Sequence, residues 1–342
     1  MSAKPLAAVL GCAGARLSDE ERAFFKAADP YGFILFARNV ETPDQVRALV
    51  NDLRDCVGRT APVLIDQEGG RVQRLKPPQW RAAPPGRRFG EVWARDAKRA
   101  EQGAASNARL IAAELMDLGI DVDCLPLLDV PVPGAHDIIG DRAFGETPDV
   151  VTALGRAVCQ GLRAGGVMPI VKHIPGHGRA RSDSHLELPV VDASHAELSR
   201  TDFATFKALA GEAAWAMTAH VVYSAIDASA PATLSAKMIG EVIRGEIGFD
   251  GPLISDDLSM KALSGDFASR TRGALAAGCD LVLHCNGDMA EMKPVVEACD
   301  ALTDKAAQRL EKAARALAEP VQIDHKALLA EFDGLLRSAA SS

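Results

Sequence analysis

Eight short apolar runs recur along the chain, and they limit its fold more than any other feature of the sequence. Each run is five or six residues long, which is typical of a parallel strand covered on both faces. The runs are Leu6–Leu10, Gly32–Phe36, Pro62–Asp66, Ile120–Leu125, Met168–Lys172, Ala214–Ala219, Pro252–Asp256 and Asp280–Cys285. Helical patterns separate them, so the sequence predicts a single-domain (β/α)8 TIM barrel. A doubly wound open sheet is the alternative, but no GxGxxG turn opens a first helix.

The segments between the runs have helical periodicity and helix-capping residues. Helices are expected at Pro43–Val57, Ala97–Leu118, Val150–Ala164, Ser194–Leu209, Ser235–Ile247, Ser259–Ala277 and Met289–Ala318. Thr42 and Thr147 each place a capping hydroxyl before a proline at the first helical position. Because no linker or low-complexity tract divides the chain, we interpret residues 1–336 as one catalytic barrel and 337–342 as a flexible C-terminal tail.

Charge and cysteine content restrict the partners and the compartment. The net charge of −8 disfavours binding to a phosphodiester backbone, so we expect no nucleic-acid partner. The seven cysteines are scattered and form no CxxC pair, which favours the reducing cytoplasm. The apolar run near the N-terminus is too short to cross a bilayer. We interpret it as the first barrel strand rather than a signal segment around Cys12, and we expect no membrane partner.

Polar residues follow the predicted strands. The third strand ends at Asp66 and continues into a charged segment that ends at Arg74. Arg142 lies beyond the fourth strand, and the fifth ends at Lys172 and His173. In a (β/α)8 barrel the carboxyl ends of the strands meet at one end, where catalytic groups lie. The sequence therefore predicts a polar site there, although each cation by itself is more often a salt-bridge partner than a ligand clamp.

The segment Lys172–His185, KHIPGHGRARSDSH, is the strongest indication of chemistry. It gathers three histidines and an aspartate on a loop interrupted by glycine and proline. One serine separates Asp183 from His185, so in an extended segment both side chains leave the same face. Asp183 can then hold one ring nitrogen of His185 and leave the other for proton transfer near neutral pH. The alternative is a surface pair that caps a turn.

Asp256 is the second candidate for chemistry. It ends an apolar strand, where a carboxylate is costly unless it is paired or used. We predict a nucleophilic or electrostatic role for Asp256. For its neighbour Asp257, capping of the next helix is the favoured interpretation.

Four motifs occur in a fixed order along the chain. They are Ile65–Arg74 (IDQEGGRVQR), Lys172–Gly178 (KHIPGHG), Asp183–His185 (DSH) and Ser255–Met260 (SDDLSM). In this combination the sequence resembles the family 3 glycoside hydrolases, and most closely the single-domain bacterial β-N-acetylhexosaminidases of peptidoglycan recycling. One departure is Ile174, which stands where the family usually has phenylalanine.

The resemblance implies a retaining exo-β-N-acetylglucosaminidase. Asp256 would attack the anomeric carbon, and His185, oriented by Asp183, would protonate the leaving oxygen and later activate water. The residues that would bind hydroxyls of the terminal N-acetylglucosamine are Asp66, Arg74, Arg142, Lys172 and His173. The resemblance implies a small carbohydrate or muropeptide substrate and neither a metal nor an organic cofactor. It specifies neither the aglycone nor the oligomeric state.

Three other functions are compatible with parts of this pattern. A metallohydrolase would use His173, His177, Asp183 and His185 as ligands, but no HxH ends the first strand. A β-N-acetylglucosaminide phosphorylase is the second, because a histidine acid/base does not repel phosphate. A non-catalytic sugar-binding protein is the third, and it would leave the Asp183–His185 pair without a purpose.

The glycines at 176 and 178 favour a mobile loop. We therefore expect the loop to bring His185 over the scissile bond only when substrate is bound. Without substrate, the pair formed by Asp183 and His185 is expected to lie away from Asp256.

Overall fold

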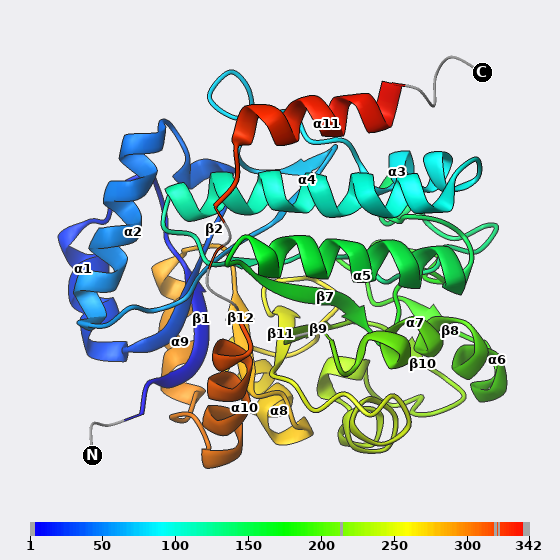
Figure 1. Ribbon diagram of the computed structural model, residues 1–342. Coiled ribbons are helices and arrows are strands. Elements are labelled where there is room, and N and C mark those ends of the chain that lie inside the picture. Colours follow the sequence, from blue (N-terminus) through cyan, green and yellow to red (C-terminus); the bar gives the residue numbers. More distant parts are fainter. Residues whose placement is uncertain (1–3, 213–214, 318–319, 321, 338–342) are drawn as a thin grey trace.

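Eight parallel strands close into a barrel in the computed structural model, which describes residues 4–212, 215–317, 320 and 322–337 (Figure 1). The barrel strands are β1 (Leu6–Gly11), β2 (Pro30–Leu35), β3 (Val63–Ile65), β6 (Val122–Asp123), β7 (Met168–Ile174), β9 (Trp215–Thr218), β11 (Leu253–Asp257) and β12 (Leu281–His284). Strands that follow one another along the chain are neighbours, and β1 pairs with β12 to close the ring. Each of the eight predicted runs overlaps one of these strands, so the predicted TIM barrel is confirmed; Ala214 of the sixth run lies outside the described residues.

Short two-stranded sheets and single helical turns decorate the barrel. The strands outside it are β4 (Gln67–Gly69) with β5 (Val72–Gln73), and β8 (Val190–Val191) with β10 (Val222–Tyr223). The short helical turns are η1 (Ala37–Asn39), η2 (Gly140–Arg142) and η3 (Ala232–Leu234). Each of these elements lies in the segment between a barrel strand and the next helix, so they lie near the end of the barrel where the strands terminate.

Helices surround the strands (Figure 1). They are α1 (Asp19–Ala28), α2 (Pro43–Val57), α3 (Gly86–Trp93), α4 (Ala97–Asp117), α5 (Pro148–Ala164), α6 (His195–Arg200), α7 (Asp202–Leu209), the π-helical η4 (Met238–Glu246), α8 (Phe267–Ala277), α9 (Met289–Ala298), α10 (Asp304–Arg315) and α11 (His325–Arg337). The Thr42 hydroxyl accepts a hydrogen bond from Gln45 N, as expected for the cap of α2. Thr147 occupies the N-cap position of α5, but its hydroxyl makes no capping bond.

Three predicted helices were too long. The segment Ser194–Leu209 breaks at Thr201, where ψ is −80° and the backbone leaves the helical region. Met289–Ala318 is interrupted between α9 and α10, and residue 318 lies outside the described part. In Ser259–Ala277, only the part from Phe267 onward is helical, because Asp266 caps α8 and the preceding residues form a loop. That loop follows β11 and contributes to the site.

The N-terminal end of the barrel is fastened by aspartates that begin strands. Asp121 Oδ1 accepts from Val63 N at 2.8 Å, and Asp280 Oδ2 accepts from Leu253 N at 2.9 Å. Each carboxylate also pairs with arginine, Asp121 with Arg54 and Asp280 with Arg244. The turns Gly119–Asp121 and Gly278–Asp280 thus tie β6 to β3 and β12 to β11.

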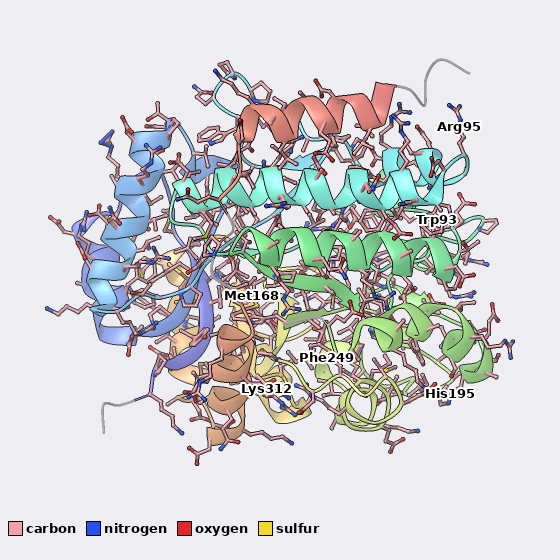
Figure 2. All side chains as sticks on the ribbon, in the orientation of Figure 1. Trp93, Arg95, Met168, His195, Phe249 and Lys312 are labelled. Atoms are coloured by element: carbon pink, nitrogen blue, oxygen red, sulfur yellow. The ribbon has the colours of Figure 1, made fainter. Side chains whose placement is uncertain are left out.

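The C-terminal helix α11, red in Figure 1, lies along α4, where Phe332 packs against Phe89. It extends to Arg337, and residues 338–342 of the predicted tail lie outside the described residues. At the lower right of Figure 2, His195 lies at the surface, where its Nε2 is 2.6 Å from Glu246 Oε2. None of the helices in the described ranges is long and apolar enough to cross a bilayer.

Candidate active site

A cavity of about 370 Å³ opens at the C-terminal end of the barrel strands. This volume lies within the range of about 300–1,000 Å³ that is usual for small-molecule sites. Of the predicted site residues, those that line the cavity are Asp66, Arg74, Arg142, Lys172, His173, His185 and Asp256. Asp183 does not line it and instead contacts His185. The structure thus brings together residues from the carboxyl ends of four barrel strands, β3, β6, β7 and β11, and from the segments that follow them.

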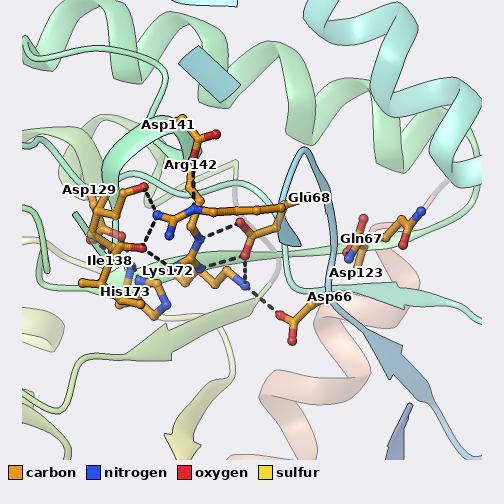
Figure 3. Close-up of polar contacts among 12 residues, drawn as sticks. Asp66, Gln67, Glu68, Asp123, Asp129, Ile138, Asp141, Arg142, Lys172 and His173 are labelled. Atoms are coloured by element: carbon orange, nitrogen blue, oxygen red, sulfur yellow. Dashed lines mark hydrogen bonds and ion pairs between the residues drawn. The ribbon is translucent and has the colours of Figure 1, made fainter. Parts of the chain in front are cut away.

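The charged floor of the cavity consists of Asp66, Glu68, Arg142 and Lys172 (Figure 3). Lys172 Nζ lies 2.8 Å from Asp66 Oδ1 and 2.7 Å from Glu68 Oε1. Arg142 donates to both oxygens of Glu68, at 2.9 and 2.8 Å. Arg74 adds a pair with Asp66 at 2.9 Å. Each charge at the floor therefore has an opposite charge beside it.

These pairs fix the ionisation of the floor. Burial alone would raise the pKa of Asp66, but Lys172 and Arg74 outweigh it and hold that pKa well below its ordinary value. Burial likewise opposes a low pKa for Glu68, and Arg142 and Lys172 lower it. Burial would lower the pKa of Lys172, but the two carboxylates raise it. The floor is therefore fully charged at neutral pH.

Glu68 was missed by the sequence analysis, although it lies inside a quoted motif. Its side chain is only 4% exposed and holds two of the predicted cations. The available signal was the spacing, because Asp66 and Glu68 stand two residues apart in an extended segment and so share a face.

Asp129, buried and also missed as a site residue, positions two histidines. Its Oδ2 lies 2.8 Å from His173 Nδ1, and its Oδ1 accepts from His177 N at 2.6 Å. Burial would raise the pKa of Asp129, but His173 and His177 outweigh it and lower this pKa to about 2. Burial and His173 lower the pKa of His177 to about 4. Because Asp129 is an acceptor, His173 carries its proton on Nδ1, and Nε2 is left to interact with a ligand.

Asp256 stands at the end of β11 and is partly exposed to the cavity. Its Oδ1 accepts from Asp257 N at 2.8 Å. Burial alone would raise the pKa of Asp256, but His173, His220 and the Asp257 N–H outweigh it and lower that pKa. Asp256 is therefore an ionised carboxylate at neutral pH, which is the state required of a nucleophile.

Asp257 has a structural function, although not the expected one. Its Oδ1 accepts from Ser259 N at 3.0 Å and from Cys285 N at 3.1 Å. The prediction that it caps the next helix was wrong, because α8 begins at Phe267 with its own cap, Asp266. Asp257 instead joins the loop after β11 to the end of β12.

Asp183 and His185 form the predicted pair, but in a turn rather than an extended segment. Asp183 Oδ1 accepts from His185 N and lies 2.8 Å from His185 Nδ1. The Asp183 carbonyl accepts from Leu186 N at 2.9 Å, which closes the turn. Burial would raise the pKa of Asp183, but the two His185 N–H groups outweigh it and lower that pKa. We call residues 183–185 the dyad turn.

The dyad turn is docked over the cavity. Ser184 O accepts from Ala262 N at 3.2 Å, and His185 O accepts from Lys261 N at 3.4 Å, so the turn contacts the loop that follows Asp256. The Ser184 hydroxyl lies 3.0 Å from His177 Nε2. His185 and Asp256 line the same cavity.

The four residues of the metallohydrolase interpretation do not converge. His173 and His177 bind Asp129, whereas Asp183 and His185 bind each other. Within the described ranges, no group of three or more His, Cys, Asp or Glu side chains is arranged to hold a metal ion. The four residues are therefore held in two separate groups, one around Asp129 and the other formed by Asp183 and His185.

Comparison with known proteins places the chain in a family. The sequence profile of the glycosyl hydrolase family 3 N terminal domain matches residues 6–319. Among similar proteins, a "Beta-hexosaminidase" of Bordetella avium is 41% identical over 80% of this chain and 79% of its own length. The "Beta-hexosaminidase" of Alkalilimnicola ehrlichii is 43% identical over 81% of this chain and 80% of its own.

Solved structures agree with the sequence comparison. Native NagZ from Neisseria gonorrhoeae superposes with a TM-score of 0.86 at 32% identity, covering 98% of each chain. The same protein in complex with N-trifluoroacetyl-D-glucosamine gives a TM-score of 0.85 at 31% identity, covering 99% of this chain and 98% of its own. The predicted resemblance is confirmed: the chain belongs to glycosyl hydrolase family 3.

Proposed function

We propose that this protein is a retaining exo-β-N-acetylglucosaminidase, with residues 1–336 as its catalytic unit. The observation that carries the proposal is the placement of an ionised Asp256 and a carboxylate-held His185 at one cavity. The relatives named β-hexosaminidase and the neighbour that binds a glucosamine derivative support this choice of sugar.

Binding of the terminal sugar is the task of floor residues together with Arg74 and His173. Asp66, Arg74, Arg142, Lys172 and His173 line the cavity and offer donors and acceptors to hydroxyl groups. A bound sugar displaces water from these groups, so a sugar that lacks a matching hydroxyl would leave some of their remaining donors and acceptors without a partner. This geometry favours one stereochemistry of hydroxyl groups over its epimers.

The chemistry follows two displacements. An oxygen of Asp256 attacks the anomeric carbon and forms a glycosyl ester, while His185 transfers a proton to the departing glycosidic oxygen. His185, now neutral, takes a proton from water, and this water attacks the anomeric carbon and releases Asp256. Two inversions give net retention. Asp183 holds His185 Nδ1, which leaves Nε2 for both transfers.

We further propose a muropeptide fragment as the substrate and the cytoplasm as the compartment. Arg38 lines the cavity and donates to the backbone carbonyls of Cys12 and Cys285. It forms no ion pair with a carboxylate of the described residues, so its charge is available to an anionic aglycone. The seven cysteines are free thiols, which supports a reducing compartment.

Azide rescue of two variants tests the mechanism. In Asp256→Ala, azide can replace the carboxylate and should give the α-glycosyl azide from an activated aryl N-acetylglucosaminide. In His185→Ala, azide should intercept the glycosyl ester and give the β-glycosyl azide. Asp250→Asn, at the opposite end of the barrel, is the control and should retain wild-type turnover. An Asp256→Ala protein with undiminished activity would refute the proposal.

Two further measurements test the finer assignments. Mass mapping after trapping with a 5-fluoro glycosyl donor should place the label on the peptide that contains Asp256. Turnover in phosphate and phosphate-free buffer separates hydrolysis from phosphorolysis, which the uncharged His185 base would also tolerate. Formation of a sugar 1-phosphate as the main product would identify a phosphorylase.

A further inference from the structure

A chain of hydrogen bonds runs beneath Asp256 through Thr218, Thr233 and His220. All three side chains are fully buried, and none lines the cavity. Thr233 Oγ1 lies 2.7 Å from both Thr218 Oγ1 and His220 Nδ1. At one end Asp256 N donates to Thr218 Oγ1 at 3.4 Å, and at the other His220 Nε2 lies 3.0 Å from the Asp257 carbonyl. The chain therefore begins and ends on adjacent residues.

Chemistry fixes the direction of each bond. A carbonyl only accepts, so His220 Nε2 carries a proton and donates to Asp257 O. Burial lowers the pKa of His220, so the ring is neutral and its Nδ1 accepts from the Thr233 hydroxyl. Thr233 has then used its proton and must accept from Thr218. The Ala219 carbonyl, 3.1 Å from Thr233 Oγ1, could receive that proton only if the buried His220 Nδ1 were left unpaired.

The chain of hydrogen bonds takes over where backbone pairing between β9 and β11 stops. The register of β11 with β9 ends at Ile254 and Met217. Beyond this pair, Asp256 N is satisfied by the Thr218 hydroxyl rather than by a backbone carbonyl. On this side the Thr218 hydroxyl keeps Asp256 N bonded after the ladder with β9 has ended, while β12 still pairs with Asp257 on the other side.

The bonds also orient the carboxylate. With Asp256 N and Asp257 O both held, the N–H of Asp257 points at Asp256 Oδ1, which it binds at 2.8 Å. Asp256 Oδ2 accepts no hydrogen bond from the described residues. One oxygen is thus anchored to the backbone and the other is left for the cavity.

We propose that Thr218, Thr233 and His220 are positioning residues that aim Asp256 at the anomeric carbon. This inference rests on the proposed nucleophilic role of Asp256. A displacement of about 1 Å at a reacting atom can lower a rate about 100-fold. The chain should therefore affect the attack by Asp256 and leave sugar binding and proton transfer by His185 nearly unchanged.

Thr218→Val is the direct test, because it removes the hydroxyl and keeps the shape of the side chain. We expect kcat/KM to fall by about 10- to 100-fold. The loss should be the same for aryl N-acetylglucosaminides with good and poor leaving groups, since the acid is intact. Labelling of Asp256 by a 5-fluoro glycosyl donor should slow by a similar factor, while the inhibition constant of N-acetylglucosamine changes by less than about twofold.

Matched variants separate positioning from general damage. Thr218→Ser keeps the hydroxyl and should recover most of the labelling rate. Thr233→Val removes the next hydrogen bond of the chain without changing a residue of β9 or β11. It should slow labelling as Thr218→Val does. Thr271→Val makes the same change at a buried threonine that bonds only the α8 backbone, and it should label at the wild-type rate. Circular dichroism and Tm confirm folding of each protein.

The outcomes are distinguishable. Wild-type labelling rates in both valine variants overturn the inference, as does a loss confined to binding of N-acetylglucosamine. A serine variant as slow as its valine counterpart also overturns it, whether or not the valine protein folds. If the wild-type label maps to a residue other than Asp256, the proposed function fails instead.

Discussion

The charged floor and the dyad turn face one cavity, yet they are built in opposite ways. The floor joins Lys172 of β7 to residues that follow β3 and β6 through buried ion pairs, and the Lys172 and Glu68 side chains are only 3% and 4% exposed. The dyad turn joins two residues that are two positions apart, and the His185 side chain is 60% exposed. One part is held by the tertiary fold, whereas the other is a local turn docked on top.

This difference separates stability from chemistry. A buried charge that loses its partner is strongly destabilising, so the floor must be complete for the barrel end to fold. An exposed imidazole can be removed at little cost to folding. Substitutions in the floor should therefore change both stability and binding, and substitutions in the dyad turn should change the rate alone.

Lys172→Met should have the largest effect. It leaves Asp66 and Glu68 without their shared cation, and we expect a loss of about 3–5 kcal/mol in the free energy of unfolding, together with loss of measurable sugar binding. Urea denaturation measures the first and calorimetry the second. The control is Lys293→Met, whose exposed pair with Glu20 should contribute little. A Lys172→Met protein as stable as wild type would show that the floor does not depend on this cation.

His185→Ala should lower kcat by about 10²- to 10⁴-fold and leave Tm within about 2 °C of wild type. The loss should shrink for a substrate whose leaving group needs no protonation. Steady-state kinetics with a series of aryl N-acetylglucosaminides, alongside thermal unfolding, checks both statements. A large fall in Tm would mean that the dyad turn also supports the fold.

Asp129→Asn tests the buried carboxylate that holds His173 and His177, through the pH dependence of the free energy of unfolding. The pKa of Asp129 is about 2 in the folded protein and about 3.9 when unfolded, so its contribution is complete above about pH 5 and is lost as pH falls through 2 to about pH 1. The variant should be about 2–3 kcal/mol less stable at pH 7, and the difference should shrink towards zero as the pH falls below about 2. Urea midpoints between these values measure the difference, and a constant gap across the range would contradict the assignment.

Ser184→Ala should have the smallest effect. It removes the hydroxyl contact with His177 but keeps the backbone bonds from Lys261 and Ala262. We expect kcat to fall by no more than about tenfold with KM unchanged, since one hydrogen bond contributes about 1 kcal/mol. Ser269→Ala, at an exposed serine, is the control. A loss as large as that of His185→Ala would show that this single contact positions the dyad turn.

The fold could be predicted because its determinants are local. Apolar runs with helices between them require strands covered on both faces, and the ends of those runs mark where polar residues gather. The ends of the longer helices could not be predicted as well from the sequence. The start of α8 depends on the Asp266 cap and on the loop that packs against the dyad turn. Neither feature changes the spacing of apolar residues along the sequence, so neither could be seen in that pattern.

The site was predicted only in part for the same reason. Asp66, Lys172 and Asp256 end strands and could be found by position. Asp129 could be seen beyond the fourth strand, but its function depends on its distance to His173 and His177. His220 follows an apolar run and gave no sign of whether it belonged to the cavity or the core.

The sequence by itself determined the barrel, the family and the residues that can carry charge or a proton, because these follow from periodicity and from motifs in order. Only the tertiary structure decided which charges neutralise one another and which way each histidine donates. Glu68 holds Arg142 and Lys172, and His220 bonds Asp257, because loops distant in sequence meet at the strand ends. Ionisation and hydrogen-bond direction depend on those separations and on burial, which no local pattern records.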